Sequence, residues 1–147
     1  MDTLQHQRLE LKYIIQERVA TAVRDFVSSY MVLDKYGVGQ PDCSYAIHSL
    51  YLDSDDLTFY WQTINGNKNR YKLRLRYYAD GPAAPVFFEI KRRMNNVIFK
   101  ERGEVKREAV DGLLAGQLPG PELLRSSQPE QRLALERFGE LMQHHAA

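Results

Sequence analysis

The sequence has one cysteine, no long apolar run and almost no net charge. A lone Cys43 excludes an internal disulfide and a cysteine-rich zinc cluster, and it fits a reducing compartment. No stretch approaches the roughly 18 apolar residues of a membrane span. The polar start, residues 1–10, lacks the apolar centre of a signal peptide. We therefore expect a cytoplasmic protein with no membrane segment in this chain.

Phosphate-binding loops and strong basicity are missing as well. A net charge of +1 on 147 residues gives no global attraction for nucleic acid, so a basic site has to come from local clustering. The chain has no Gly-x-x-x-x-Gly-Lys motif, and Gly37-x-Gly39 lacks the third glycine of a dinucleotide fingerprint. Any bound nucleotide would therefore be held by side chains and not by a loop of backbone N–H groups.

Hydrophobic periodicity predicts an α+β protein organised as one domain over residues 1–147. Apolar residues alternate with polar ones in several short segments, as in half-buried strands, and recur at helical spacing in others. The connection at residues 94–96 is short, so the flanking strands pair antiparallel. The acidic run at residues 53–56 is better explained as a helix cap than as a metal loop. The expected strands cover 4–13, 44–53, 69–79, 86–93 and 97–104, and the expected helices 16–31, 57–64, 106–115 and 131–143.

The charged residues of these strands gather on one face. Successive side chains of a strand point to opposite sides, so in residues 69–79 the basic residues share one face and the apolar residues the other. The same rule applies to residues 4–13, 86–93 and 97–104. Eight basic and two acidic residues would then share one surface, on a chain whose net charge is +1. The basic residues are Arg8, Lys12, Lys72, Arg74, Arg76, Lys91, Lys100 and Arg102, and the acidic residues are Glu10 and Glu89.

Such a face predicts a site for a phosphate-rich anion. Like charges on neighbouring strands repel one another, and a bound polyanion offsets that repulsion. Glu10 and Glu89 would orient the basic side chains or hold a divalent cation. The competing interpretation is an ordinary solvated sheet face. Nucleic acid is not expected, because Tyr78 is the one aromatic residue of its strand on the charged side, and RNA-binding sheets need exposed aromatics for stacking.

An ordered set of motifs then resembles a known family. Glu10-Leu11-Lys12-Tyr13, residues 49–53, residues 72–78 and the run Phe88-Glu89-Ile90-Lys91, followed by residues 100–102, are similar to the VTC domain. This is the polyphosphate polymerase domain of the vacuolar transporter chaperone family. It belongs to the triphosphate tunnel metalloenzymes, akin to CYTH domains. The resemblance covers about residues 4–115.

The resemblance implies a tunnel of antiparallel strands with inward basic side chains, part of which this chain would form. It also implies transfer of a γ-phosphoryl group from ATP or another nucleoside triphosphate to a polyphosphate chain, with Mn or Mg present. The implied catalytic residues are Lys12, Arg74, Arg76 and Lys91. The implied phosphate-binding residues are Arg8, Lys72, Lys100 and Arg102. The implied metal-binding residues are Glu10 and Glu89.

One departure from the family pattern leaves the activity open. The tunnel needs about eight strands, whereas five are expected here, so the chain corresponds to the N-terminal portion of such a domain. The family's later strands, with further arginines and a metal-binding glutamate, would follow the last helix. An open sheet edge would then allow self-association. Two alternatives therefore stay open: a non-catalytic module that binds polyphosphate or another phosphorylated ligand, and a triphosphate hydrolase, which the Glu-x-Lys pattern at residues 10–12 disfavours.

Overall fold

The computed structural model describes residue 11 and residues 13–146 of the 147-residue chain. The described residues form two compact units, one ending at residue 46 and the other beginning at residue 47. The first unit contains helix α1, Glu17–Val27, and a 3-10 turn at Pro41–Cys43. The predicted helix over residues 16–31 is therefore too long, because α1 ends at Val27 and residues 28–30 form a turn.

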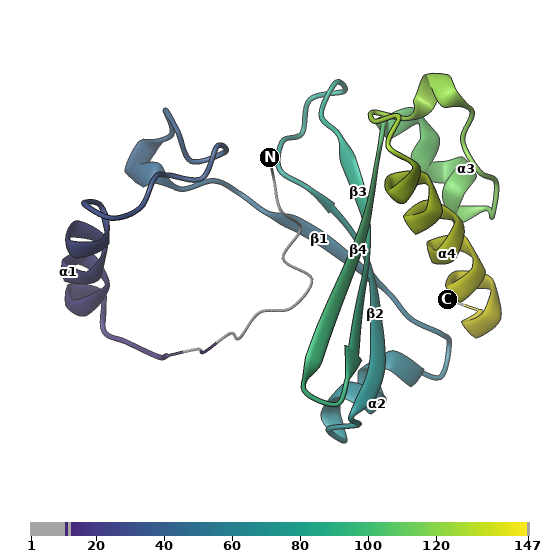
Figure 1. Cartoon of the computed structure of the whole chain (residues 1–147), viewed down its shortest axis with the longest axis horizontal. Helices are drawn as coiled ribbons and strands as arrows, with labels where there is room; N and C mark the ends of the chain where they lie inside the picture. The colour runs from purple at the N-terminus through teal and green to yellow at the C-terminus, as the bar shows by residue number, and fades with distance from the viewer. Residues whose placement is uncertain (1–10, 12, 147) are drawn as a thin grey trace. The chain divides into compact units, whose positions relative to one another are not determined.

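The second unit is built on a four-stranded antiparallel sheet with the strand order β1-β2-β3-β4 (Figure 1). Its strands are β1 (His48–Leu52), β2 (Asn69–Tyr77), β3 (Val86–Met94) and β4 (Val97–Val105). Its helices are α2 (Thr58–Ile64), α3 (Val110–Leu114) and α4 (Pro129–His145). The predicted α+β class with an antiparallel sheet is confirmed, but the described strands form an open sheet and not a closed barrel.

The core lies between the sheet and α4. On this face of the sheet, Phe88 meets the ring of Phe138 edge-on at 5.0 Å between centroids. Gly103 on β4 leaves room for Leu135 of α4, whose side chain occupies the space that a Cβ would need. In Figure 1, α3 lies beside α4 on the same side of the sheet. This packing buries one face of the sheet and leaves its other face for the charged residues.

The side chain of Asp53 caps helix α2, as the sequence predicts, but Asp55 and Asp56, expected in the first turn of this helix, lie before its first residue, Thr58. Asp53 accepts hydrogen bonds from the backbone N–H groups of Ser54, Phe59 and Tyr60 at 2.8–3.0 Å. The cap satisfies donors that the first turn of a helix leaves without partners. Of the helices described here, none has the length and apolar character needed to cross a bilayer.

Several element boundaries differ from the predicted ones for identifiable reasons. The strand expected from residue 44 begins at His48, which pairs with Tyr77, the last residue of β2. The pairing of β1 with β2 therefore stops at His48, because β2 ends at Tyr77. The helix expected over residues 106–115 divides into a 3-10 turn, Arg107–Ala109, and α3. Helix α4 begins at Pro129, whose missing N–H suits a first turn.

The first predicted strand lies almost entirely outside the described residues. Residues 4–10 and 12 are not described, and Leu11 and Tyr13 are not in a strand. The described sheet therefore has four strands where the sequence predicts five.

Candidate functional site

One face of the sheet carries the predicted basic residues, and we call it the cationic face. Residues directly opposite one another in an antiparallel pair point to the same side of a sheet. The register aligns Arg74 with Glu89, and Glu89 with Arg102. It aligns Lys72 with Lys91, and Lys91 with Lys100. The cationic face therefore includes the predicted residues Lys72, Arg74, Arg76, Glu89, Lys91, Lys100 and Arg102, and the same register places Arg70, Phe87, Arg93 and Glu104 on this side.

Glu89 lies at the centre of this face and is fully buried. One carboxylate oxygen accepts a hydrogen bond from Arg74 Nε at 2.5 Å. The other oxygen accepts from Arg102 Nε at 2.7 Å and lies 2.9 Å from Lys100 Nζ. A buried carboxylate is unfavourable unless cations and hydrogen bonds compensate it. Here three cationic side chains surround one acid and cover it from solvent.

The electrostatics of Glu89 follow from these contacts. Burial alone would raise the pKa of its carboxyl group, but the hydrogen bond from Lys100 and the charges of Arg102 and Lys100 outweigh burial. They hold the pKa of Glu89 at about 2. Glu89 is therefore ionised at neutral pH and fixes the directions of Arg74 and Arg102.

Beside this Arg74–Glu89–Arg102 row lies a row of three lysines. Lys72, Lys91 and Lys100 are direct neighbours across β2, β3 and β4. The two rows together carry five cationic side chains and one carboxylate, Glu89. Opposed like charges destabilise a sheet. The arrangement concentrates positive charge on a small area, although the net charge of the whole chain is only +1.

Hydroxyl groups and one aromatic ring border the arginines, and the sequence alone did not identify them as site residues. Arg74 Nη1 donates to the hydroxyl of Tyr51 at 3.3 Å, and Arg76 Nε donates to Ser49 Oγ at 3.2 Å. These contacts depend on the β1–β2 register, which places Tyr51 beside Arg74 and Ser49 beside Arg76. The sequence shows β1 as an aromatic-rich apolar strand and does not reveal that register.

Arg102 is held by a second set of groups. Its Nη2 donates to the Tyr78 hydroxyl at 3.1 Å, and its guanidinium lies 4.3 Å from the centre of the Phe87 ring. A guanidinium over an aromatic face is attracted by the ring as well as shielded from water. Tyr78, Phe87 and Glu89 together restrict Arg102 to one direction.

Three predicted site residues lie outside the described part of the chain: Arg8, Glu10 and Lys12. The structure therefore gives no contacts for them. It brings together the other seven predicted residues, which belong to β2, β3 and β4.

The described residues do not by themselves fit a divalent-metal site. They contain no cluster of three or more His, Cys, Asp or Glu side chains suited to an ion. Both oxygens of Glu89 already accept from cationic groups, so a metal ion there would displace them. This donor set suits the arginine-orienting role that the sequence also allowed for Glu89.

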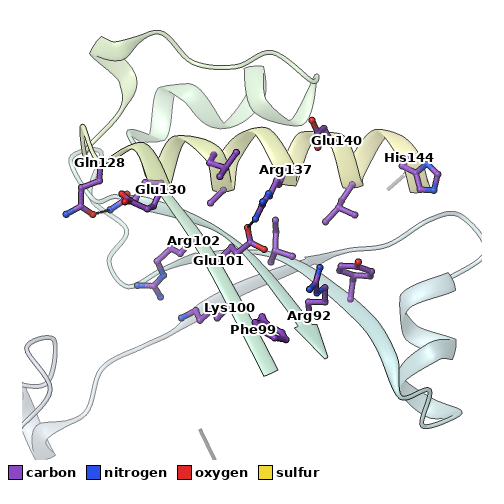
Figure 2. A pocket seen from close by; sticks show the side chains of 16 residues that line it. Arg92, Phe99, Lys100, Glu101, Arg102, Gln128, Glu130, Arg137, Glu140 and His144 are labelled. Atoms are coloured by element: carbon purple, nitrogen blue, oxygen red, sulfur yellow. Dashed lines mark hydrogen bonds and ion pairs between the residues drawn. The ribbon is translucent and has the colours of Figure 1, made fainter. Parts of the chain in front are cut away.

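A groove of the second unit lies on the other side of the sheet. Figure 2 shows this groove between α4 and β4, where Arg137 of α4 points toward Glu101 of β4. It has a volume of about 1280 Å³. Its charges are of mixed sign, and Arg137 and Glu101 form an ion pair at 2.7 Å. This groove lacks the one-sided charge of the cationic face, so we place the candidate site on the latter.

Comparison with known proteins bears on the identity of the whole chain. The sequence matches the VTC domain family over residues 7–146. No curated protein gives a significant match. The family match spans nearly the whole chain, including all four strands and the cationic face. The chain therefore belongs to the VTC domain family, which is associated with polyphosphate synthesis.

Proposed function

We propose that this chain binds a nucleoside triphosphate and polyphosphate on the cationic face, as part of a polymerase that transfers the γ-phosphoryl group to the polyphosphate chain. The observation that carries the proposal is the row Lys72–Lys91–Lys100 beside Arg74 and Arg102. The two rows carry five cationic side chains against one carboxylate, Glu89, and a bound anion offsets the repulsion between these cations. A linear chain of phosphates supplies many negative charges along one extended molecule.

The residues then divide into two kinds. Arg74 and Arg102, oriented by Glu89, present fixed guanidinium groups that suit planar, two-point contacts with phosphate oxygens. Lys100 shares the Glu89 carboxylate with them, and Lys72 and Lys91 add further positive charge beside these groups. By the family resemblance, Arg76 joins the first group, and Lys12 and Arg8 add further cations.

Such residues would act by positioning the phosphate groups and neutralising their charge. Phosphoryl transfer involves little covalent participation by the protein, because the developing charge sits on the phosphate oxygens. Fixed cations at those oxygens lower the barrier without reorganising during the reaction. Mn or Mg would supply further neutralisation when bound. Glu10 is the proposed ligand within this chain, because both oxygens of Glu89 already accept from cations.

A binding module without catalysis is the second candidate. The observation that favours it is the open, four-stranded sheet with no metal-fitting carboxylate cluster among the described residues. In this interpretation the cationic face holds or guides polyphosphate made elsewhere. Binding is common to both candidates, whereas polymer synthesis belongs to the first.

Two measurements separate these candidates. Titration with tripolyphosphate, followed by calorimetry, tests binding, and the double variant Arg74→Ala/Arg76→Ala is expected to abolish it while the chain stays folded. The matched control is Arg132→Ala/Arg137→Ala, which removes the same charge from α4. Equal affinity in both double variants would refute the proposed site.

The second measurement tests catalysis. The protein is incubated with ATP and Mg or Mn, and the products are separated on a gel stained for polyphosphate. Polymer that depends on Arg74 and Arg76 supports the polymerase. Binding without polymer supports the module, and release of phosphate without polymer supports a hydrolase.

A further inference from the structure

We infer that strand β1 contributes two hydroxyl donors, Tyr51 and Ser49, to direct contact with the bound phosphate chain. This inference rests on the proposed function and extends the site from the charged residues of β2–β4 to the neighbouring strand. It assigns a role to an element whose sequence has no Asp, Glu, Lys or Arg between residues 48 and 52.

The first step concerns the unused hydrogen of each hydroxyl. A hydroxyl carries one donor hydrogen and two acceptor lone pairs. The Tyr51 oxygen accepts from Arg74, and the Ser49 oxygen accepts from Arg76. Among the described residues, neither hydroxyl donates to an acceptor. Each therefore has its hydrogen available for an incoming oxygen.

The second step concerns where these hydrogens lie. Tyr51 is half-exposed, and Arg74 and Arg76 are its neighbours on the cationic face. Lys72 Nζ lies 5.9 Å from the centre of the Tyr51 ring. A phosphate oxygen drawn to Lys72 and Arg74 therefore arrives beside the Tyr51 hydroxyl. Because each hydroxyl already accepts from an arginine, its remaining hydrogen is polarised, which strengthens donation to an anion.

The third step separates a donor from a mere support for Arg74. If Tyr51 only accepts the hydrogen bond from Arg74, its phenolate form performs that role at least as well. If Tyr51 donates to phosphate, the phenolate loses the hydrogen and repels the ligand. The charged groups facing Tyr51 are Lys72, Arg74 and Arg76 of β2, with Glu89 of β3 behind Arg74. The hydrogen bond from Arg74 is the main cause that lowers the pKa of Tyr51, so the phenolate forms at a lower pH than in free tyrosine.

The experiment compares the wild-type chain with Tyr51→Phe and Ser49→Ala by calorimetric titration with tripolyphosphate at neutral pH. Hydrogen bonds to charged groups are worth enough to predict roughly 10-fold weaker binding for Tyr51→Phe. Ser49→Ala is expected to weaken binding by a factor of about 3 to 10. Tyr60→Phe, a half-exposed tyrosine of α2, is the matched control and is expected to leave affinity unchanged.

Repeating the titrations up to about pH 10 supplies the decisive readout. Lysine deprotonation weakens binding in every variant, so the quantity to follow is the ratio of wild-type to Tyr51→Phe affinity. We expect that ratio to fall toward one as pH rises. A ratio that stays constant or grows would overturn the donor role, as would unchanged affinity in both β1 variants. Absence of wild-type binding would instead overturn the proposed function, and this inference with it.

Discussion

Replacing Glu89 by Gln tests the electrostatic centre of the site. The carboxyl group has its pKa lowered from an ordinary 4.5 to about 2 by its cationic neighbours. At about 1.4 kcal/mol for each pKa unit, ionised Glu89 stabilises the folded chain by about 3 kcal/mol relative to its neutral form. Glutamine keeps the shape and loses the charge. We therefore expect Glu89→Gln to lower the free energy of unfolding by about 3 kcal/mol at pH 7.

The difference in the free energy of unfolding between wild type and Glu89→Gln should depend on pH in a defined direction. A carboxyl group with a lowered folded pKa stabilises the protein above its unfolded pKa, and that contribution disappears as pH falls toward the folded pKa. The difference between wild type and Glu89→Gln should thus be full above about pH 5 and vanish near pH 2. Urea unfolding followed by Trp61 fluorescence measures it. A difference that does not change with pH would refute the reasoning.

Glu104→Gln provides the comparison for that experiment. Glu104 of β4 pairs with Arg125 at 3.7 Å, and 28% of its side chain is exposed. Exposed ion pairs are worth about 0–1 kcal/mol. If Glu104→Gln lowers the free energy of unfolding as much as Glu89→Gln does, the burial of Glu89 does not strengthen its ion pairs.

Three further outcomes follow from the packing and the charge. Gly103→Ala places a Cβ against Leu135 and 2.9 Å from the Gln131 carbonyl oxygen, so it should cost about 1–3 kcal/mol in urea unfolding. Phe138→Ala removes the ring that meets Phe88 and should cost about 3–5 kcal/mol by the same assay. Tripolyphosphate affinity should fall steeply as salt is added, because partly exposed charges are screened, and calorimetry at several ionic strengths checks this. A salt-independent affinity would indicate a different kind of ligand.

The sheet could be predicted from sequence where alternation and short connections were both present. Strands β2, β3 and β4 alternate apolar and charged residues, and residues 94–96 leave room for little besides a hairpin. Alternation also placed Lys72, Arg74 and Arg76 on one face, since that needs no knowledge of neighbouring strands. The ends of a strand that depend on the length of the neighbouring strand were less predictable. His48 begins β1 because Tyr77 ends β2, and a single strand's sequence does not contain that information.

The contacts within the site could be predicted only in part. The pattern identified Glu89 among basic residues, but its full burial and its contacts with three cations follow from the pairing of β3 with strands on both sides. Tyr51 and Ser49 were missed for the same reason. Their neighbours are arginines some 25 residues later in the chain, brought beside them by the β1–β2 register. Side-chain roles that cross strands need the register, which periodicity does not supply.

A substitution in the lysine row is expected to weaken phosphate binding without lowering the stability of the fold. Lys72→Gln removes one charge from a row of three opposed lysines, so it should leave the free energy of unfolding unchanged or raise it by a few tenths of a kcal/mol. It should also weaken tripolyphosphate binding by about 5- to 10-fold, since a partly buried charge contact is lost. Urea unfolding and calorimetry on the same sample measure both effects. Lys68→Gln, an exposed lysine just before β2, should change neither. An ordinary solvated sheet face predicts that the two variants behave alike, and that result would remove the reason for assigning the lysine row to a bound polyanion.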